Sequence, residues 1–289
     1  MADVSTESTV ADRIRAALPN LPDAERRVAR VLLTNYPVAG LETIARVAAR
    51  SGTSGPTVLR LATRLGLGGY TELQQLLRDE LDARQQSPLA AYGAEPEGGD
   101  SVQSRSATIL SQAVAGTVSG MEGADFDQAV ELITGKNRVT TVGGRFSNVL
   151  AEYLAAHLQE LRRGVRPVRM SERVPVLLDL SRRDVLIVFD FRRYQTDVVN
   201  FGRAAAKQGA QLVLVTDRWM SPLSTAAKVV LIADVAAPSP FDSLVPAMAL
   251  VETLIAGVVA KLGDQPRDRI ARYDELWESQ FTALDDSAG

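Results

Sequence analysis

The sequence predicts two differently built halves, an all-α N-terminal half and a C-terminal α/β half with a doubly wound parallel sheet. Before residue 85 every strong pattern is helical, with apolar residues three and four positions apart. After residue 106, short β-branched runs alternate with longer helical stretches, which is typical of successive βαβ units. Residues 85–106 are rich in Pro, Gly, Ser and acids and keep no sustained period. We therefore expect an N-terminal domain over 1–84, a linker over 85–106 and a second domain over 107–289.

The composition limits the kinds of functional site that the chain can contain. With 289 residues and 46% apolar content the chain is expected to be globular, and no uninterrupted apolar run approaches the roughly 20 residues that span a bilayer. The first residues contain acids and no apolar signal core, so we expect a cytoplasmic protein with no membrane partner. There is no cysteine and one histidine, His157, which sits in a helical pattern and is expected to be structural and partly exposed. We expect no metal site and no cofactor.

Residues 41–70 predict a helix-turn-helix. Ile44, Val47 and Ala48 recur at helical spacing, and Gly52 can adopt the positive φ of a tight turn. Ser54 is placed as the N-cap of the second helix. That second helix carries an apolar stripe of four residues: Val58, Leu61, Ala62 and Leu65. Gly66 is expected to end it.

The residues expected opposite this stripe point to nucleic acid. The whole chain has a net charge of -3, yet residues 26–64 contain seven arginines against one acid, Glu42, a local excess of +6. A recognition helix presents short polar side chains and arginines to base edges and phosphates. The predicted DNA-binding residues are Ser54, Pro56, Thr57, Arg60 and Arg64, with Arg27 and Arg30 from the preceding helix, which is expected to bury Ala24, Val28, Val31 and Leu32. Alternatively, these arginines simply solvate a helical surface.

Five runs in the C-terminal half are predicted strands: 138–143, 167–170, 184–191, 211–217 and 228–234. Residues 244–262 are apolar almost all round and predict a helix buried in the domain or against a partner subunit, with Pro246 tolerated in its first turn. In an open α/β sheet, ligands bind beyond the carboxyl ends of the strands where the winding reverses. The ends of the first and third strands are therefore the places to expect a ligand.

A family resemblance adds to this prediction. The stretch "IARVAARSGTSGPTVLRLATRLGLGGYTEL" resembles the DNA-binding domain of the RpiR (MurR/RpiR) family of bacterial transcriptional regulators, except that Thr53 stands where the family more often has valine. The matching positions are Ala45, Ser54, Thr57, Val58, Arg60, Leu65, Gly66, Gly69 and Tyr70. The resemblance implies a C-terminal sugar isomerase (SIS) domain with flavodoxin-type strand order, a homodimer or homotetramer, double-stranded operator DNA as partner, and a small-molecule effector, a phosphosugar or another anion.

The candidate effector residues lie in three loops. Gly143, Gly144, Arg145 and Ser147 follow the first strand, Asp190, Arg192, Arg193, Tyr194 and Thr196 follow the third, and Ser239 and Asp242 precede the last apolar helix. Arg145 replaces the second glycine of the SIS pattern G-x-G-x-S, and the third loop carries arginines where SIS domains usually have hydroxyls. Two interpretations are open: the arginines converge on an anionic ligand, or they pair with Asp190, Asp184 or acids of a neighbouring subunit. Ser243 is expected to cap the helix.

Three functions are compatible with the sequence. The leading one is a transcription factor whose DNA affinity changes when an anionic metabolite occupies the SIS-like domain. A sugar-phosphate isomerase is the second, although neither the loop after the first strand nor the loop after the third contains the Glu or His that usually moves the proton. The third is an oligomerisation scaffold that has lost its ligand. The sequence therefore favours a protein that is not an enzyme.

Overall fold

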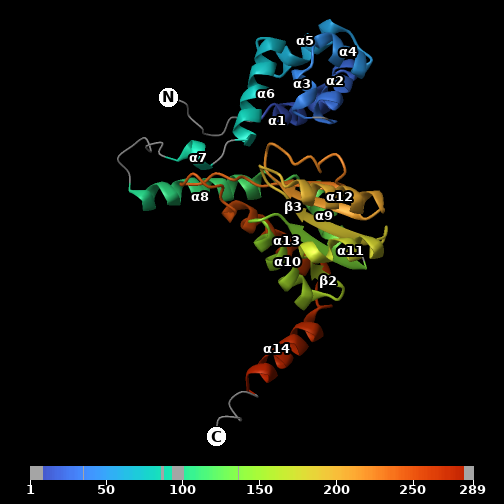
Figure 1. Ribbon diagram of the computed structural model, residues 1–289, viewed down its shortest axis with the longest axis vertical. Coiled ribbons are helices and arrows are strands. Elements are labelled where there is room, and N and C mark those ends of the chain that lie inside the picture. The colour runs from blue at the N-terminus through green and yellow to red at the C-terminus, as the bar shows by residue number, and fades with distance from the viewer. Residues whose placement is uncertain (1–8, 35, 86–87, 93–100, 136, 283–289) are drawn as a thin grey trace. The chain divides into compact units, whose positions relative to one another are not determined.

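The computed structural model describes residues 9–34, 36–85, 88–92, 101–135 and 137–282. It divides into two compact units, Met1–Tyr92 and Gly93–Gly289 (Figure 1). Both ends of the predicted linker 85–106 are helical, because α6 runs to Gln85, α7 follows and α8 begins at Val102. Residues 93–100 of that prediction lie outside the described residues.

The N-terminal unit consists of helices around one apolar core. Its elements are α1 (Val10–Ala17), a 3-10 turn η1 (Leu18–Asn20), α2 (Asp23–Thr34), α3 (Val38–Leu41), α4 (Ile44–Ser51), α5 (Gly55–Arg64), α6 (Tyr70–Gln85) and α7 (Pro88–Ala91). The core takes in α1, α2, α4, α5 and α6, with Ile14, Leu61 and Leu73 among its most buried side chains. Apolar residues at helical spacing on each element account for this arrangement.

The predicted helix-turn-helix is present. Gly52 adopts φ +60 directly after α4, and Gly66 adopts φ +81 just beyond Leu65, the C-cap of α5. The predicted stripe of α5 is buried at all four positions. In α2, however, the buried residues are Glu25, Val28, Ala29 and Leu32. Ala24 and Val31 are only partly covered, so their predicted burial is corrected.

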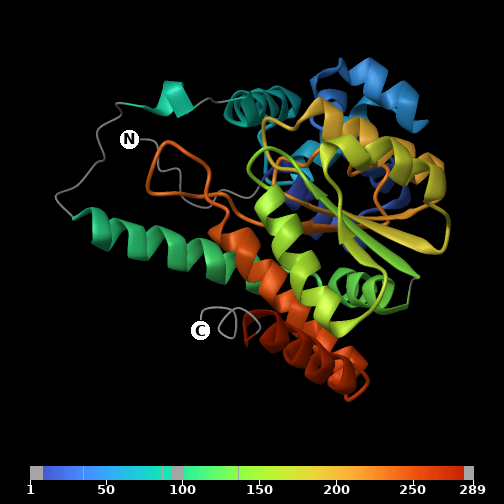
Figure 2. The same cartoon turned by 60° about the horizontal axis from the view of Figure 1, so that its bottom comes forward.

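The C-terminal unit is a parallel sheet covered by helices on both faces. Its helices are α8 (Val102–Ser119), α9 (Gly123–Gly135), α10 (Asn148–Leu161), η2 (Met170–Glu172), α11 (Arg173–Asp179), α12 (Thr196–Lys207), α13 (Val245–Leu262) and α14 (Arg267–Thr282). Its strands are β1 (Arg138–Gly143), β2 (Val165–Pro167), β3 (Asp184–Phe189), β4 (Gln211–Thr216) and β5 (Val229–Ile232). Figure 2 shows the sheet edge-on among these helices.

The strand order is β2-β1-β3-β4-β5 with every neighbouring pair parallel. Alternate side chains of β3 enter two different cores: Val185, Ile187 and Phe189 pack with α9, α10 and α13, whereas Leu186 and Val188 pack with α11 and α12. All six β3 residues are buried, as expected for a strand covered on both faces. The winding reverses between β1 and β3, and this reversal defines the edge where a ligand is expected.

One strand is shifted from its prediction. Residues 167–170 were expected to form it, but β2 runs from Val165 to Pro167. Gly164, at φ +77, brings the chain sharply onto β1, so pairing begins at Val165 opposite Val139. The nitrogen of Pro167 cannot donate a hydrogen bond, and the chain turns into η2 soon afterwards.

Helix α13 explains the long apolar run. Among the described residues it alone is long and apolar enough to cross a membrane by length and composition. One side of it, including Leu250, Leu254 and Val258, is fully buried against the sheet core. Pro246 lies in its first turn as predicted. The other side is less covered, with Val245 48% and Val259 44% exposed, so the predicted burial within the domain holds for one side of the helix only.

Candidate functional site

The start of α5 carries a short chain of hydrogen bonds. Ser54 occupies the N-cap position, but its hydroxyl lies 3.0 Å from the Thr57 hydroxyl instead of capping a backbone N–H. The Arg60 guanidinium donates to the same Thr57 oxygen at 3.1 Å. Thr57 is only 4% exposed, so its predicted outward position is wrong. Its hydroxyl instead holds Arg60 against the first turn of the helix.

Two other predicted DNA contacts have partners inside the unit. Arg64 donates to the buried carboxylate of Glu25 at 2.7 Å, which ties α5 to α2. Arg27 donates to the carbonyl oxygens of Ser51 and Gly52 at 3.3 and 3.4 Å, so it caps the end of α4. These contacts favour structural roles for both arginines.

The outward face of α5 therefore differs from the predicted set. Its exposed residues at positions i, i+3, i+4 and i+7 are Pro56, Leu59, Arg60 and Thr63. Leu59 is 42% exposed. The sequence analysis missed Leu59 because an apolar side chain in an amphipathic helix is normally assigned to the core. The signal that identifies it is its position, one residue beyond the buried Val58 on the side away from Leu61.

The basic character of this unit is also lower than the sequence count. Arg26 pairs with Asp23 at 3.1 Å and Arg50 pairs with Glu42 at 3.2 Å. Asp23 and Glu25 lie just before the counted segment, and including them reduces its excess to +4. Arg30 and Arg46 are exposed on α2 and α4.

At the carboxyl edge of the sheet, the glycine loop after β1 adjoins the loop after β3. A side chain at Gly143 would come within 2.5 Å of the Ser147 backbone, so the turn requires glycine there. The buried Ser147 hydroxyl donates to the Phe189 carbonyl oxygen at 2.7 Å and accepts from the Gly144 N–H at 2.8 Å. The backbone N–H of Arg145 donates to the Gln195 side chain. The two predicted loops are thus in contact, and Ser147 joins them.

Asp190 and Tyr194 take part in internal hydrogen bonds. Asp190 is 2% exposed, and its carboxylate accepts from the Ser221 hydroxyl and, at 3.4 Å, from the Gln195 N–H. The Tyr194 hydroxyl donates to Asp217 at 2.7 Å. Both groups bind the loop after β3 to the loop after β4, which favours the structural interpretation for them.

Arg192 pairs with another of the candidate residues. Its Nε lies 2.7 and 2.8 Å from the two carboxylate oxygens of Asp242, and its guanidinium stacks over the Trp219 ring at 5.1 Å. The open interpretation named Asp190, Asp184 or a neighbouring subunit as acidic partners, and the observed partner is Asp242. Asp184 instead accepts from Ser181 and pairs with Arg138.

The remaining candidates are exposed. Arg145 lies with its guanidinium 4.9 Å from the Phe146 ring centroid, and Arg193 adopts φ +60. Thr196 begins α12 and Ser239 accepts from the Phe241 N–H at 3.3 Å. Ser243 accepts from the first N–H of α13 at 3.2 Å, which agrees with a capping role, although Leu244 holds the N-cap position.

The sequence analysis did not identify Arg173, which lies at this same edge. It begins α11, pairs with Asp197 at 2.5 Å and stacks over the Phe201 ring. Its Nε is buried and has no hydrogen-bond partner among the described residues. No strand-end motif precedes it, since β2 is short and ends six residues earlier.

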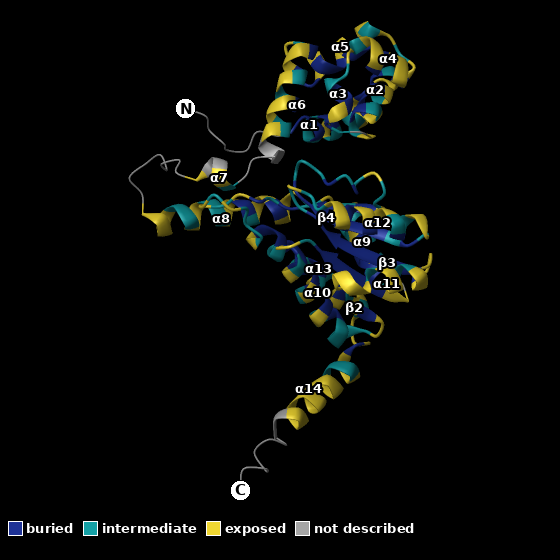
Figure 3. Ribbon diagram, viewed as in Figure 1, coloured by how far each residue is buried: buried dark blue, intermediate teal, exposed yellow. Residues whose placement is uncertain are grey.

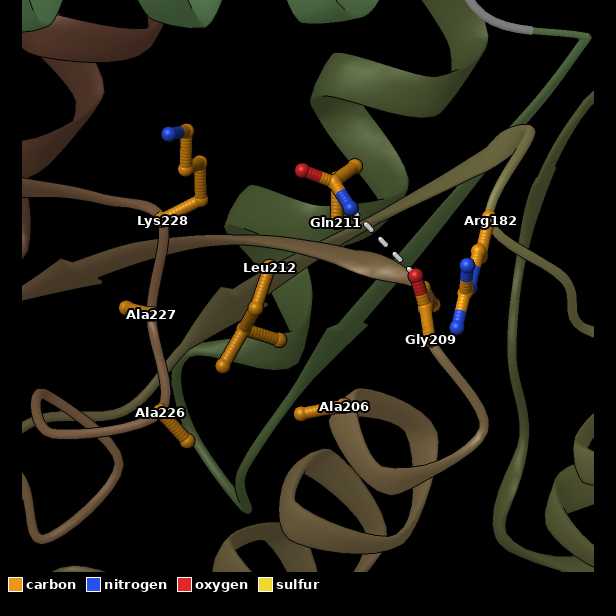
Figure 4. Close-up of a pocket in the computed structure, with 9 residues that line it drawn as sticks. Arg182, Ala206, Gly209, Gln211, Leu212, Ala226, Ala227 and Lys228 are labelled. Atoms are coloured by element: carbon orange, nitrogen blue, oxygen red, sulfur yellow. Dashed lines mark hydrogen bonds between the residues drawn. The ribbon is translucent and has the colours of Figure 1, made fainter.

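A cavity of about 380 Å³ lies at the opposite, amino edge of the sheet (Figure 4). Arg182, Gln211, Leu212 and Lys228 are among its lining residues, and the Gln211 side chain donates to the Gly209 carbonyl oxygen. None of the three predicted loops contributes to it. The chemistry concentrated at the carboxyl edge therefore makes that edge the better effector candidate. No cluster of metal-ligating side chains occurs among the described residues.

Comparison with known proteins agrees with this architecture. Residues 8–84 match the helix-turn-helix domain of the rpiR family, and residues 132–257 match the SIS domain. The transcriptional regulator HexR of Escherichia coli is 23% identical over 283 residues, covering 93% of this chain and 95% of HexR. Longer bifunctional proteins of Paraburkholderia and Burkholderia are 25% identical over 234 to 236 residues, and the chain spans about a third of their length.

Solved structures share the fold. The sugar isomerase domain of an RpiR transcription factor from Sphaerobacter thermophilus is 25% identical, with TM-score 0.56 over 60% of this chain and 98% of that one. The NanR protein of Vibrio vulnificus, solved with ManNAc-6P, is 21% identical, with TM-score 0.54 over 92% of this chain and 97% of NanR. With both domains matched in the same order, this chain belongs to the RpiR family, with a helix-turn-helix domain followed by a C-terminal SIS domain.

Proposed function

We propose that this cytoplasmic protein binds operator DNA through the outward face of α5, and that a small anion at the carboxyl edge of the SIS sheet changes its DNA affinity. The observation that carries the DNA proposal is the exposed stripe Pro56, Leu59, Arg60 and Thr63 on the second helix of a helix-turn-helix. Such a helix enters the major groove, where arginine can pair with guanine and apolar groups can contact thymine methyls. Ser54 and the exposed Arg30 and Arg46 are assigned to the DNA backbone.

The hydrogen bond from the Arg60 guanidinium to the Thr57 hydroxyl supports a more specific assignment. A guanidinium held by a buried hydroxyl loses less side-chain entropy when it meets a base, so Thr57 acts as a positioning residue. Arg60 is the candidate for direct base contact. Arg64 serves as its matched control because it lies on the same helix with its guanidinium committed to Glu25.

The test begins with selection of bound duplexes from a random library by the full-length protein, followed by affinity measurement. Arg60→Ala should weaken binding by about 1 to 3 kcal/mol, roughly 5- to 150-fold. Arg64→Ala should lower thermal stability and change affinity less. Equal effects of the two variants on DNA, or none from Arg60→Ala, would contradict the assignment.

The effector proposal depends on arginine. Arg145 and Arg193 are both exposed. Their loops are neighbours, because the backbone N–H of Arg145 donates to the side chain of Gln195, two residues beyond Arg193. Guanidinium groups bind phosphate and carboxylate through paired hydrogen bonds. NanR was solved with a phosphosugar, which supports a phosphosugar or another small anion as the ligand class. Because Asp190, Arg192 and Tyr194 already have internal partners, Arg145 and Arg193 carry the predicted contact.

Thermal shift of the full-length protein against phosphosugars and carboxylates tests this proposal. An anion that raises the unfolding temperature of the native protein, and no longer does so after Arg145→Ala with Arg193→Ala, supports it. Absence of any shift, with an intact dimer or tetramer, favours the scaffold alternative. Isomerase activity is not proposed, since the acid at the strand end, Asp190, is buried and hydrogen-bonded to Ser221.

A further inference from the structure

Helix α14 presents an apolar face to solvent. Its start is fixed to the C-terminal unit, where Arg269 donates to the Gln159 carbonyl oxygen at 2.8 Å. Beyond that point residues 271–280 are all exposed, as Figure 3 shows in yellow. Tyr273, Leu276 and Trp277 are 37%, 49% and 57% exposed, and the rings of Tyr273 and Trp277 stack with centroids 6.2 Å apart.

A helix of this length draws little stability from its backbone alone. Isolated helices shorter than about 12–15 residues are marginal in water, α14 has 16 residues, and most helical stability in proteins comes from packing an apolar face. Ile270, Tyr273, Trp277 and Gln280 follow one another at spacings of three, four and three residues. This is the a/d spacing of a seam that pairs with another helix.

The charges along α14 indicate which helix would pair with it. The basic half, residues 267–273, contains Arg267, Arg269 and Arg272 with one acid, Asp268, and the acidic half, residues 274–282, contains Asp274, Glu275 and Glu278 with no basic residue. A parallel copy would place like charges side by side. An antiparallel copy would place each basic half beside an acidic half, and a two-fold axis satisfies both contacts at once.

We propose that α14 packs antiparallel against α14 of a second copy of this chain. The seam is centred between Tyr273 and Trp277, so that Tyr273 of one copy lies against Trp277 of the other, in the stacked or edge-to-face contact that aromatic rings favour. This surface goes beyond DNA binding and effector sensing, and it assigns a role to residues 267–282 that no predicted element covered.

Because the chain contains no cysteine, single introduced cysteines report the pairing directly. Ile270→Cys and Gln280→Cys are co-expressed on chains of different mass and oxidised under mild conditions. Disulfide formation requires Cβ atoms about 3.5 to 4.5 Å apart. The antiparallel pair predicts the mixed 270–280 disulfide and little of either symmetric product. Predominant symmetric products would indicate parallel helices, and no cross-link would place α14 on another surface or partner; either result overturns the proposal.

Sedimentation of the full-length protein provides the second measurement. Tyr273→Ala with Trp277→Ala should raise the dissociation constant for self-association at least tenfold, and added salt should weaken association of the native chain. Ala271→Gln, one residue outside the seam, is the control and should leave association unchanged. Circular dichroism and the DNA affinity of each variant separate loss of this contact from unfolding and from failure of DNA binding. Unchanged association in the double variant would refute the proposal.

Discussion

At the residue scale, the partner of a charged side chain limits what that side chain can do. Seven arginines occupy residues 26–64, yet Arg27 and Arg64 hold α4 and α2 through a carbonyl pair and a buried carboxylate. Removing Arg64 leaves Glu25 buried without its partner, which we expect to cost about 1 to 3 kcal/mol of folding free energy. Arg60 and Leu59 lie on the exposed face instead. Their combination suits a site with a guanine near a thymine.

Leu59 gives the first prediction. If its side chain contacts a thymine methyl, replacing that thymine by deoxyuridine should weaken binding of the native protein by about 0.8 kcal/mol, roughly fourfold. Leu59→Ala should bind the thymine duplex with a similar loss and no longer distinguish the two duplexes. Titration of each protein with each duplex measures the coupling.

The control for Leu59 is Val38→Ala, which removes an exposed apolar side chain from α3 of the same unit. It should retain the full preference for thymine. If Leu59→Ala also retains that preference at every thymine of the site, Leu59 does not contact a thymine methyl.

At the element scale, side-chain bonds between loops fix the carboxyl edge of the sheet. The Arg192–Asp242 pair joins the loop after β3 to the segment before α13, and its side chains are 17% and 20% exposed. Ser147 joins β1 to β3, and Asp190 joins β3 to the loop after β4. The edge is therefore preorganised, which limits how the exposed arginines can meet a ligand.

Asp242→Asn should lower the free energy of unfolding of the C-terminal unit by about 1 to 3 kcal/mol, because the half-buried guanidinium loses a charged, two-point partner. Urea denaturation measures the change. Asp264→Asn is the control, since its pair with Arg267 at 3.7 Å has side chains 97% and 83% exposed. Comparable losses in both variants would show that the Arg192–Asp242 bond adds no specific stability.

Tyr70 connects the start of α6 to the segment before α4 by donating to the Glu42 carbonyl oxygen at 3.0 Å. Burial and the nearby Glu42 charge raise the pKa of Tyr70 to about 12, from the usual 10.0. The folded state therefore keeps its proton while the unfolded chain ionises, so this stability is fully present below pH 10 and is lost between about pH 10 and 12. Burial beside Glu80 also raises the pKa of Tyr36.

Urea midpoints of the N-terminal unit measured from pH 8 to 12 should fall above pH 10. Tyr70→Phe should make the decline shallower, because one ionising group is removed. Tyr92→Phe is the control, since Tyr92 is 74% exposed. A decline as steep in Tyr70→Phe as in the native protein would mean that Tyr70 does not contribute to it.

At the scale of the whole molecule, the two units have separate apolar cores. Separate cores allow each unit to unfold cooperatively by itself. Calorimetry should therefore resolve two transitions. Leu73→Ala should lower the unfolding temperature of the N-terminal transition only, and Leu154→Ala that of the C-terminal transition only. Each substitution should reduce the free energy of unfolding of its unit by about 2 to 5 kcal/mol, since both side chains are at most 1% exposed. A single transition shifted by both variants would contradict this independence.

Local patterns in the sequence were sufficient to predict the architecture. Helical spacing in 41–70 fixed the helix-turn-helix, and strands rich in β-branched residues fixed the parallel sheet, because apolar period and glycine position are local properties. The same logic placed Gly52 and the loops at the ends of β1 and β3. Residues 267–282 were not assigned to a predicted helix, because only a few apolar residues lie at helical spacing among many charged ones.

Contacts between distant elements, by contrast, establish which candidate side chains are available for binding. Arg64 has Glu25 as partner, 39 residues away, and Arg192 has Asp242, 50 residues away. No local pattern encodes such pairs, because they depend on how separate elements pack. The same holds for the burial of Thr57 and the exposure of Leu59. Positions 57 and 58 of this helical turn are buried, whereas position 59 is exposed. Packing therefore places Leu59 on the outer face beside Arg60, which was predicted there, and residue type alone did not indicate this for a leucine.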